Sequence, residues 1–178
     1  MNQILLHSGV LFDPLNPEPE KINIDDIAHA LVNIPRWTGH TKFFYSVAQH
    51  CLRCCEITEQ PYKLEVLMHD ATEAYLLGMA SPIKHRMPEY LKAEKKLYNT
   101  VDFVFGLETS FYKEQIKIID KVVLDEEYYF LMNHGGEIIV SPEMADLYGS
   151  EKDKEQIKRE FIETFKNLQN ERLNKKDS

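Results

Sequence analysis

The chain has 178 residues, of which 43% are hydrophobic, and its net charge at neutral pH is -8. These values predict one domain, residues 1–178, built around a single substantial core. The acidic balance without a basic block argues against a nucleic-acid partner. The lack of a membrane-length apolar run or a signal-like N-terminus argues against a membrane protein and predicts a cytoplasmic one.

The apolar residues predict an all-α fold that follows a short irregular or hairpin arm. In the arm, residues 1–20, the apolar piece ILLHSGVLF precedes DPLNPEPE, whose three prolines exclude a regular element. After it, apolar residues recur at helical spacing, with Pro35, Pro61 and Gly106 as boundaries. The tail, residues 170–178, is expected to fray. The expected helices span 25–33, 41–59, 61–78, 88–105, 112–132 and 152–168, with SPIK (81–84) in a loop.

Three cysteines, Cys51, Cys54 and Cys55, crowd one predicted helix. Cys51 and Cys54 share the helix face that carries Val47, so we expect them to fill the core. No second ligand pair stands at the spacing of a zinc site. The cluster therefore indicates a reducing compartment rather than a disulfide framework.

Four residues that could bind a metal ion lie inside apolar helical runs: His50, His69, Asp70 and Asp120. An unpartnered imidazole or carboxylate in such a place costs about 2 kcal/mol or more, and a divalent cation is the simplest shared partner. Glu73 lies over the same helix face as His69 and Asp70. The alternative is structural: a core His50, a salt-bridged Asp70 and a surface Asp120.

The order His, His-Asp, Asp on a helical chain resembles the HD-domain phosphohydrolases. The stretches that carry this resemblance lie between residues 8 and 131: DIAHALVNIPRWTGHTKFFYSVAQH, LMHDATEAY, SPIK and IKIIDKVVLDEE. They are most similar to the small single-domain nucleotide hydrolases of that superfamily, which are bacterial 5′-deoxynucleotidases and phage deoxynucleoside triphosphate hydrolases, including dATPases. The resemblance implies an HD-domain helical bundle that hydrolyses deoxynucleotides.

A cation held by two imidazoles and two carboxylates keeps positions open for a water molecule and a phosphate oxygen. Glu73 is not needed as a ligand, so it is free to exchange a proton with the attacking water or the leaving group. The resemblance implies the same acid/base role, and an exposed helical glutamate is the alternative. Relatives commonly have Gly-Asp where this chain has Leu77 and Gly78, which leaves the sugar preference open.

Five residues are expected to contact the substrate. The resemblance implies that Arg36 faces the nucleotide, where a guanidinium grips phosphate oxygens at two points, and that Trp37 forms a wall for the sugar or base. Either Lys84 or Lys117 could bind a phosphate beyond the metal-bound one, and two such lysines would favour a polyphosphate over a monophosphate substrate. For each lysine, an exposed surface position is the alternative. His40 could reach the phosphates or bond to a loop carbonyl.

The first expectation is therefore a deoxynucleoside triphosphate triphosphohydrolase, with dATP as a candidate substrate. A 5′-deoxynucleotidase acting on dNMPs is the second, and a non-catalytic nucleotide-sensing module is the third. The single divalent cation could be Zn, Mn, Co, Fe, Ni or Mg, because this ligand set does not select among them. We expect a homo-oligomer, with the aromatic stripe of the last helix, Ile157, Phe161 and Phe165, as a candidate interface.

Overall fold

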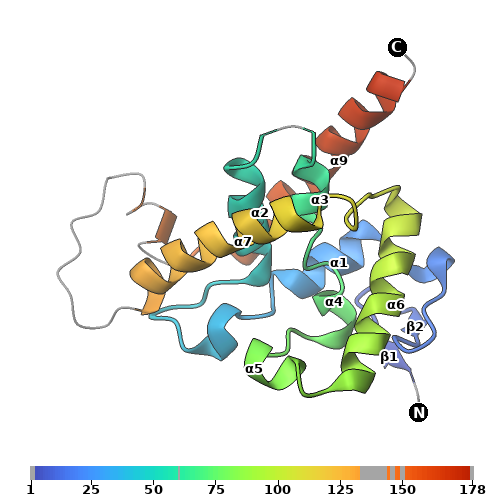
Figure 1. The fold of residues 1–178 in the computed structure, drawn as a ribbon, viewed down its shortest axis with the longest axis horizontal. Coiled ribbons are helices and arrows are strands. Elements are labelled where there is room, and N and C mark those ends of the chain that lie inside the picture. Colours follow the sequence, from blue (N-terminus) through green and yellow to red (C-terminus); the bar gives the residue numbers. More distant parts are fainter. Residues whose placement is uncertain (1–2, 60, 133–143, 145–146, 149–150, 177–178) are drawn as a thin grey trace.

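The computed structural model describes residues 3–59, 61–132, 144, 147–148 and 151–176. Its regular structure is almost entirely helical, with one small hairpin near the N-terminus, so the predicted all-α fold with a short arm is confirmed (Figure 1). Within the described residues, no helix combines the length and the apolar character that crossing a membrane requires.

The arm is a hairpin whose strands β1 (Ile4–Leu5) and β2 (Leu11–Phe12) pair in antiparallel register, with Ile4 opposite Phe12. Phe12 is fully buried against the ring of Tyr75, which ties the arm to the helices. A 3-10 turn, η1 (Pro19–Lys21), follows. The expectation that prolines exclude regular structure here was wrong, because the first position of a helical turn needs no N–H donor.

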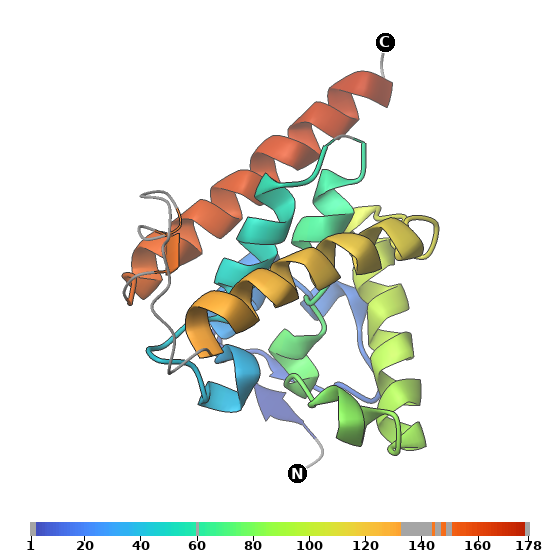
Figure 2. The same ribbon diagram turned by 60° about the vertical axis from the view of Figure 1, so that its left-hand side comes forward.

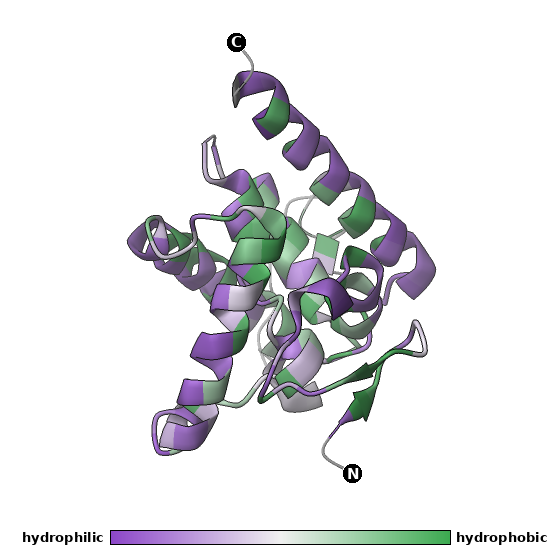
Figure 3. Ribbon diagram, turned by 90° about the vertical axis from the view of Figure 1, so that its right-hand side faces the viewer, coloured by the Kyte–Doolittle hydropathy of each residue, from purple (hydrophilic) through white to green (hydrophobic). Residues whose placement is uncertain are grey.

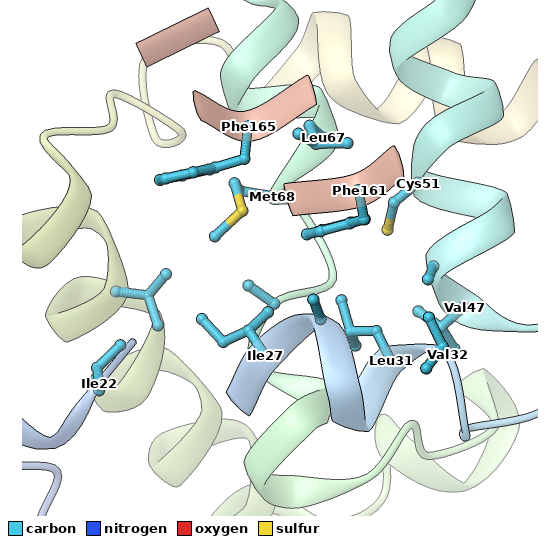
Figure 4. Packing of buried hydrophobic residues seen from close by; sticks show 14 of the residues in the cluster. Ile22, Ile27, Leu31, Val32, Val47, Cys51, Leu67, Met68, Phe161 and Phe165 are labelled. Atoms are coloured by element: carbon cyan, nitrogen blue, oxygen red, sulfur yellow. The ribbon is translucent and has the colours of Figure 1, made fainter. Parts of the chain in front are cut away.

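The main core lies between α1 (Ile24–Leu31), α2 (Val47–Glu56), α3 (Lys63–Leu67) and α9 (Lys154–Lys176). Figure 4 shows residues of these elements turned toward one another, among them Leu31, Leu67, Phe161 and Phe165. Since Ile157, Phe161 and Phe165 are buried in this core, the expectation that they form an oligomer interface was wrong.

Helix α2 begins six residues later than the predicted start of 41, because a capping box fixes its first turn. The Ser46 hydroxyl accepts a hydrogen bond from the Gln49 amide, and the Gln49 side chain accepts one from the Ser46 amide. The preceding chain forms a short turn, η2 (Arg36–Gly39), and a bridge between Pro35 and Ser46. The sequence SVAQ, residues 46–49, has the serine and glutamine that this capping box requires.

The helix predicted over 61–78 is broken in the middle. The structure has α3 (Lys63–Leu67) and α4 (Glu73–Leu76), joined by a turn that contains His69 and Asp70. The His69 ring donates a hydrogen bond of 2.7 Å from Nδ1 to the carbonyl of Val66. A continuing helix would offer that carbonyl to the amide of Asp70, so the imidazole competes with the helical ladder at this point.

The next segments lie close to their predicted bounds, with one difference in secondary structure. SPIK, expected as a loop, is a short helix, α5 (Ser81–Lys84). Helix α6 (Pro88–Phe105) has the predicted bounds and ends at Gly106, whose φ of 63° is left-handed. Helix α7 (Lys113–Glu127) continues into a π-helical turn, η3 (Tyr128–Met132). Helix α7 crosses α2 and α3 (Figure 2). This crossing places Asp120 next to His50 of α2.

Helix α9 continues to Lys176, so the prediction of a frayed tail was wrong for residues 170–176, while 177–178 lie outside the described residues. Hydrophilic residues make up most of α9 (Figure 3), which fits a helix with one buried stripe. Near its end, Arg172 donates to both carboxylate oxygens of the fully buried Glu65 at 2.7 and 2.6 Å, and to the carbonyl of Gly106. This ion pair anchors the last turns.

Replacing Arg172 with alanine is expected to lower the free energy of unfolding by about 3 kcal/mol, because the Glu65 carboxylate would stay buried without its cation. Urea titration followed by circular dichroism measures the change. The control is Arg159→Ala, which removes the same side chain from an exposed position of α9 and should change the free energy by less than about 0.5 kcal/mol. Equal losses from the two substitutions would contradict the anchoring role.

Candidate metal centre

Side chains from three separate segments meet beside α7. His50 comes from α2, His69 and Asp70 come from the turn after α3, and Asp120 comes from α7. Nε2 of His50 lies 3.3 Å from Nε2 of His69 and 3.1 Å from Oδ1 of Asp120. Oδ2 of Asp70 lies 3.3 Å from Nε2 of His69 and 3.9 Å from Nε2 of His50. The structure thus brings together all four residues that the sequence proposed as ligands.

These separations can be compared with those around a single ion. Two donor atoms about 2.1 Å from an ion, at angles of about 90–110°, lie about 3.0–3.4 Å from each other. The separations of His50 from His69, of His50 from Asp120 and of His69 from Asp70 fall within this range. The separation of His50 from Asp70 is somewhat longer. Each of the four side chains therefore has at least one donor separation of the size that a shared divalent cation would produce.

The outer nitrogens of both rings fix which atoms face the centre. Nδ1 of His50 bonds to Oε1 of Glu127 at 2.7 Å, and Nδ1 of His69 bonds to the carbonyl of Val66 at 2.7 Å. Both oxygens accept, so in each neutral ring Nδ1 carries the hydrogen and Nε2 keeps a lone pair. Two lone pairs and two carboxylates then face one another, which is the donor chemistry of a cation site.

The electrostatics of the centre also favour a positive charge. Burial and the nearby Arg36 oppose protonation of His50, yet Glu127 and Asp120 raise its pKa well above the ordinary value. Burial disfavours the charged form of Asp120, but the hydrogen bond with His50 and the proximity of His69 lower the pKa of Asp120 to about 2. The carboxylate of Asp120 is therefore ionised, and the field around His50 attracts a cation.

Glu127 is a candidate site residue that was not predicted from the sequence. It is fully buried, and its Oε2 accepts hydrogen bonds from Nε of Arg36 at 3.1 Å and from the indole of Trp37 at 3.0 Å, while Oε1 accepts the bond from His50. A carboxylate in this place orients the imidazole and raises its basicity. The sequence does hold a signal for Glu127: it follows Asp120 by two helical turns, so the two side chains share one face of the helix.

A cleft with a volume of about 460 Å³ opens beside the centre. Six of the predicted functional residues are among those that line it: Arg36, Trp37, Asp70, Glu73, Lys84 and Asp120. Lys117 and His40 are outside this lining. Lys117 is exposed and pairs with Glu114 at 3.0 Å, and His40 is exposed at the end of η2. The structure thus gathers most, but not all, of the predicted substrate contacts at one cleft.

Arg36 and Lys84 both reach the cleft while they pair with acidic side chains. Nη2 of Arg36 lies 3.0 Å from Glu127, and Nη1 points toward Asp70 at 3.9 Å. Nζ of Lys84 lies 2.6 Å from Oε1 of Glu94 on α6. These ion pairs hold the two cations at the rim of the cleft.

Glu73 begins α4 and lies in the cleft next to Asp70. Burial and the negative charge of Asp70 raise the pKa of Glu73 to about 8. This chain has Leu77 and Gly78 where relatives commonly have Gly-Asp, and the difference affects Glu73 because a Cβ at Gly78 would clash with Oε2 of Glu73. Any side chain at position 78 would have to displace the Glu73 carboxylate. Leu77 has a φ of 60°, a conformation that favours glycine.

All three cysteines are free and buried, so the prediction that Cys51 and Cys54 fill the core is confirmed. Cys51 packs among the residues of the main core (Figure 4). Burial raises the pKa of the Cys51 and Cys54 thiols, and that of Cys55 to about 11. Unless a metal ion binds to them, these thiols stay protonated at neutral pH.

Comparison with known proteins places the chain beside two relatives. No family model matches the sequence. The chain is 42% identical over 96 residues to YfdR, an uncharacterized protein of Escherichia coli K12, a match that covers 54% of this chain and 53% of that protein. It is 36% identical over 110 residues to an uncharacterized protein of Rhodobacter capsulatus, with 56% of each chain covered. The chain thus spans about half the length of these relatives.

Replacing Glu127 with glutamine is expected to weaken binding of zinc or manganese by about 10-fold to 100-fold. A carboxylate can accept from His50, Arg36 and Trp37 together, whereas an amide must turn its NH₂ toward one of these donors. Isothermal titration calorimetry on the metal-free protein measures the affinity.

The matched control is Glu126→Gln, at the neighbouring residue, which pairs with Arg53 at 3.0 Å outside the centre. This variant should keep the native affinity. If Glu127→Gln bound the metal as tightly as Glu126→Gln, Glu127 would have no role in orienting His50.

Proposed function

We propose that this chain is a metal-dependent phosphohydrolase that acts on deoxynucleotides, and specifically a deoxynucleoside triphosphate triphosphohydrolase. The observation that carries the proposal is the meeting of His50, His69, Asp70 and Asp120, from distant parts of the chain, at donor separations of 3.1–3.9 Å. A structural ion pair would need only two of these groups. The resemblance to HD-domain phosphohydrolases points to the same reaction.

The two imidazoles and two carboxylates would hold the cation. When bound, a divalent cation there lowers the pKa of a water molecule and offsets the negative charge of a phosphoryl group. The other side chains of the cleft then bind the substrate, orient it and move protons.

Glu73 is the group we assign to proton transfer. Its carboxylate lines the same cleft as Asp70 and Asp120, but it makes none of the close donor contacts that join the four ligands. It takes a proton from the attacking water and returns one to the leaving oxygen. Burial and the negative charge of Asp70 raise its pKa, and a divalent cation would counter the charge of Asp70 and favour the ionised form that a base requires.

The charge of the cleft suits a phosphorylated substrate. Its charged lining residues are the carboxylates Asp70, Glu73 and Asp120 and the cations Arg36 and Lys84. Because the pKa of Glu73 is raised to about 8, Asp70 and Asp120 balance Arg36 and Lys84 at neutral pH. A divalent cation would make the lining net positive whether or not Glu73 is ionised, and phosphate groups would then meet a positive surface.

The nucleotide would enter the cleft past Arg36, Lys84 and Trp37. Arg36 and Lys84 provide two cations beyond the metal for a chain of phosphates, and Trp37 offers an indole wall for the sugar or base. The volume of about 460 Å³ lies within the usual range for small-molecule sites.

A 5′-deoxynucleotidase that acts on dNMPs is the second candidate. It is favoured by the position of Lys117, which is exposed and paired with Glu114 rather than turned into the cleft. One phosphate needs fewer cations than three, and the cation with Arg36 would be enough to hold it.

Incubating the purified protein with each dNTP, NTP and dNMP, under several divalent metals, separates these functions. Chromatographic detection of tripolyphosphate released from dNTPs is the expected result. Release of orthophosphate from dNMPs alone would select the second candidate. If no nucleotide were hydrolysed with any metal, a non-catalytic, nucleotide-sensing role would replace both.

Glu73→Gln is expected to lower the turnover rate by about a hundredfold or more, because the amide cannot accept the proton. Metal content and nucleotide binding should stay close to native values. The control is Glu89→Gln, an exposed residue at the start of α6, which should leave turnover unchanged. Full activity of Glu73→Gln would remove Glu73 from the proposed chemistry.

A further inference from the structure

We propose that the thiolate of Cys54 is an additional ligand of the cation and gives the centre a preference for thiophilic metals such as zinc and cobalt. The inference rests on the proposed metal centre and names the class of ion that the centre would take. Cys54 lies one turn after His50 on α2 and is fully buried. Its Sγ lies 3.5 Å from Nε2 of His50, the nitrogen that faces the centre.

The separation of 3.5 Å matches two ligands of one ion. With a zinc–nitrogen bond of about 2.05 Å, a zinc–sulfur bond of about 2.3 Å and an angle near 107°, the nitrogen and sulfur lie about 3.5 Å apart. Sγ of Cys54 and donor atoms of His50 and His69 also lie within 4.8 Å of one another. The thiol therefore belongs to the same cluster of donors as the two imidazoles.

The neighbouring cysteines provide an internal comparison. Cys51 also has its sulfur within 4.8 Å of donor atoms of His69 and Asp70. It packs in the main core, however, whereas Cys54 is the cysteine whose Sγ contacts Nε2 of His50. Cys55 lies on the same helix and faces the main core as well. Of the three cysteines, Cys54 has the sulfur that is best placed to bind the same ion as His50.

Coordination by Cys54 would exchange one bond for another. The S–H bond breaks and the proton passes to solvent buffer, while a bond forms between sulfur and the cation. A thiolate is a softer ligand than a carboxylate or an imidazole, so it favours zinc and cobalt over magnesium and manganese. The metal preference of this chain would then depend on a residue outside the four ligands proposed from its sequence.

Substitution of cobalt(II) into the protein tests the proposal by absorption spectroscopy. A thiolate bound to cobalt(II) gives a near-ultraviolet charge-transfer band, which nitrogen and oxygen ligands do not give. The native protein and the variants Cys51→Ser and Cys55→Ser are expected to show this band, and Cys54→Ser is expected to lose it. A band that persists in Cys54→Ser, or its absence from the native cobalt protein, would overturn the proposal.

A second measurement needs no variant, in case the Cys54→Ser protein does not fold. X-ray absorption at the zinc edge of the native protein should show a sulfur neighbour at about 2.3 Å. A shell made only of nitrogen and oxygen would overturn the proposal. Where Cys54→Ser folds, its preference for zinc over manganese in a competition titration should fall at least about tenfold.

The outcomes also separate this inference from the proposed function. Hydrolysis of nucleotides by a protein without a metal–sulfur bond would refute the role of Cys54 alone. A cobalt–thiolate band in a protein that hydrolyses no nucleotide would refute the proposed hydrolase and keep the ligand. If no cobalt bound at all, both proposals would be refuted.

Discussion

The contact on which the rest of the site depends is the hydrogen bond between the buried Glu127 and the ring of His50. A carboxylate with no exposure to solvent is costly unless it is paired, and Glu127 is paired by Arg36, Trp37 and His50 together. These partners come from η2 and α2, so one side chain of α7 fixes two other segments. It also turns Nε2 of His50 toward Asp120, two helical turns earlier on α7.

The fold contributes a second constraint, which is the break between α3 and α4. His69 ends the helix by taking the carbonyl of Val66 with its own ring, and the same bond leaves its Nε2 facing His50 at 3.3 Å. The group that interrupts the helix is therefore also the group that enters the centre. Glu73 opens the next helix on the cleft side, where a carboxylate is free to exchange protons.

The sequence was informative where local patterns decide the structure. Helix α6 has its predicted bounds, because Pro88 and Gly106 mark its ends. The sequence was misleading where contacts between residues far apart in the chain determine the structure. The helical tail depends on Arg172 reaching the buried Glu65, and the break at His69 depends on a ring orientation, neither of which helical periodicity reveals. The four candidate ligands could be named from residue type and order, whereas the spacing of Glu127 from Asp120 indicates a shared helix face but not its partners on η2 and α2.

Metal content after equilibrium dialysis of the purified protein against zinc or manganese decides whether the four side chains share a cation. We expect one ion bound for each native chain. We also expect a large loss of bound ion in His69→Ala and Asp120→Asn, whose substitutions lie in different segments and meet only at the centre. A native protein that retained no ion, or variants that retained as much as the native protein, would contradict a shared cation.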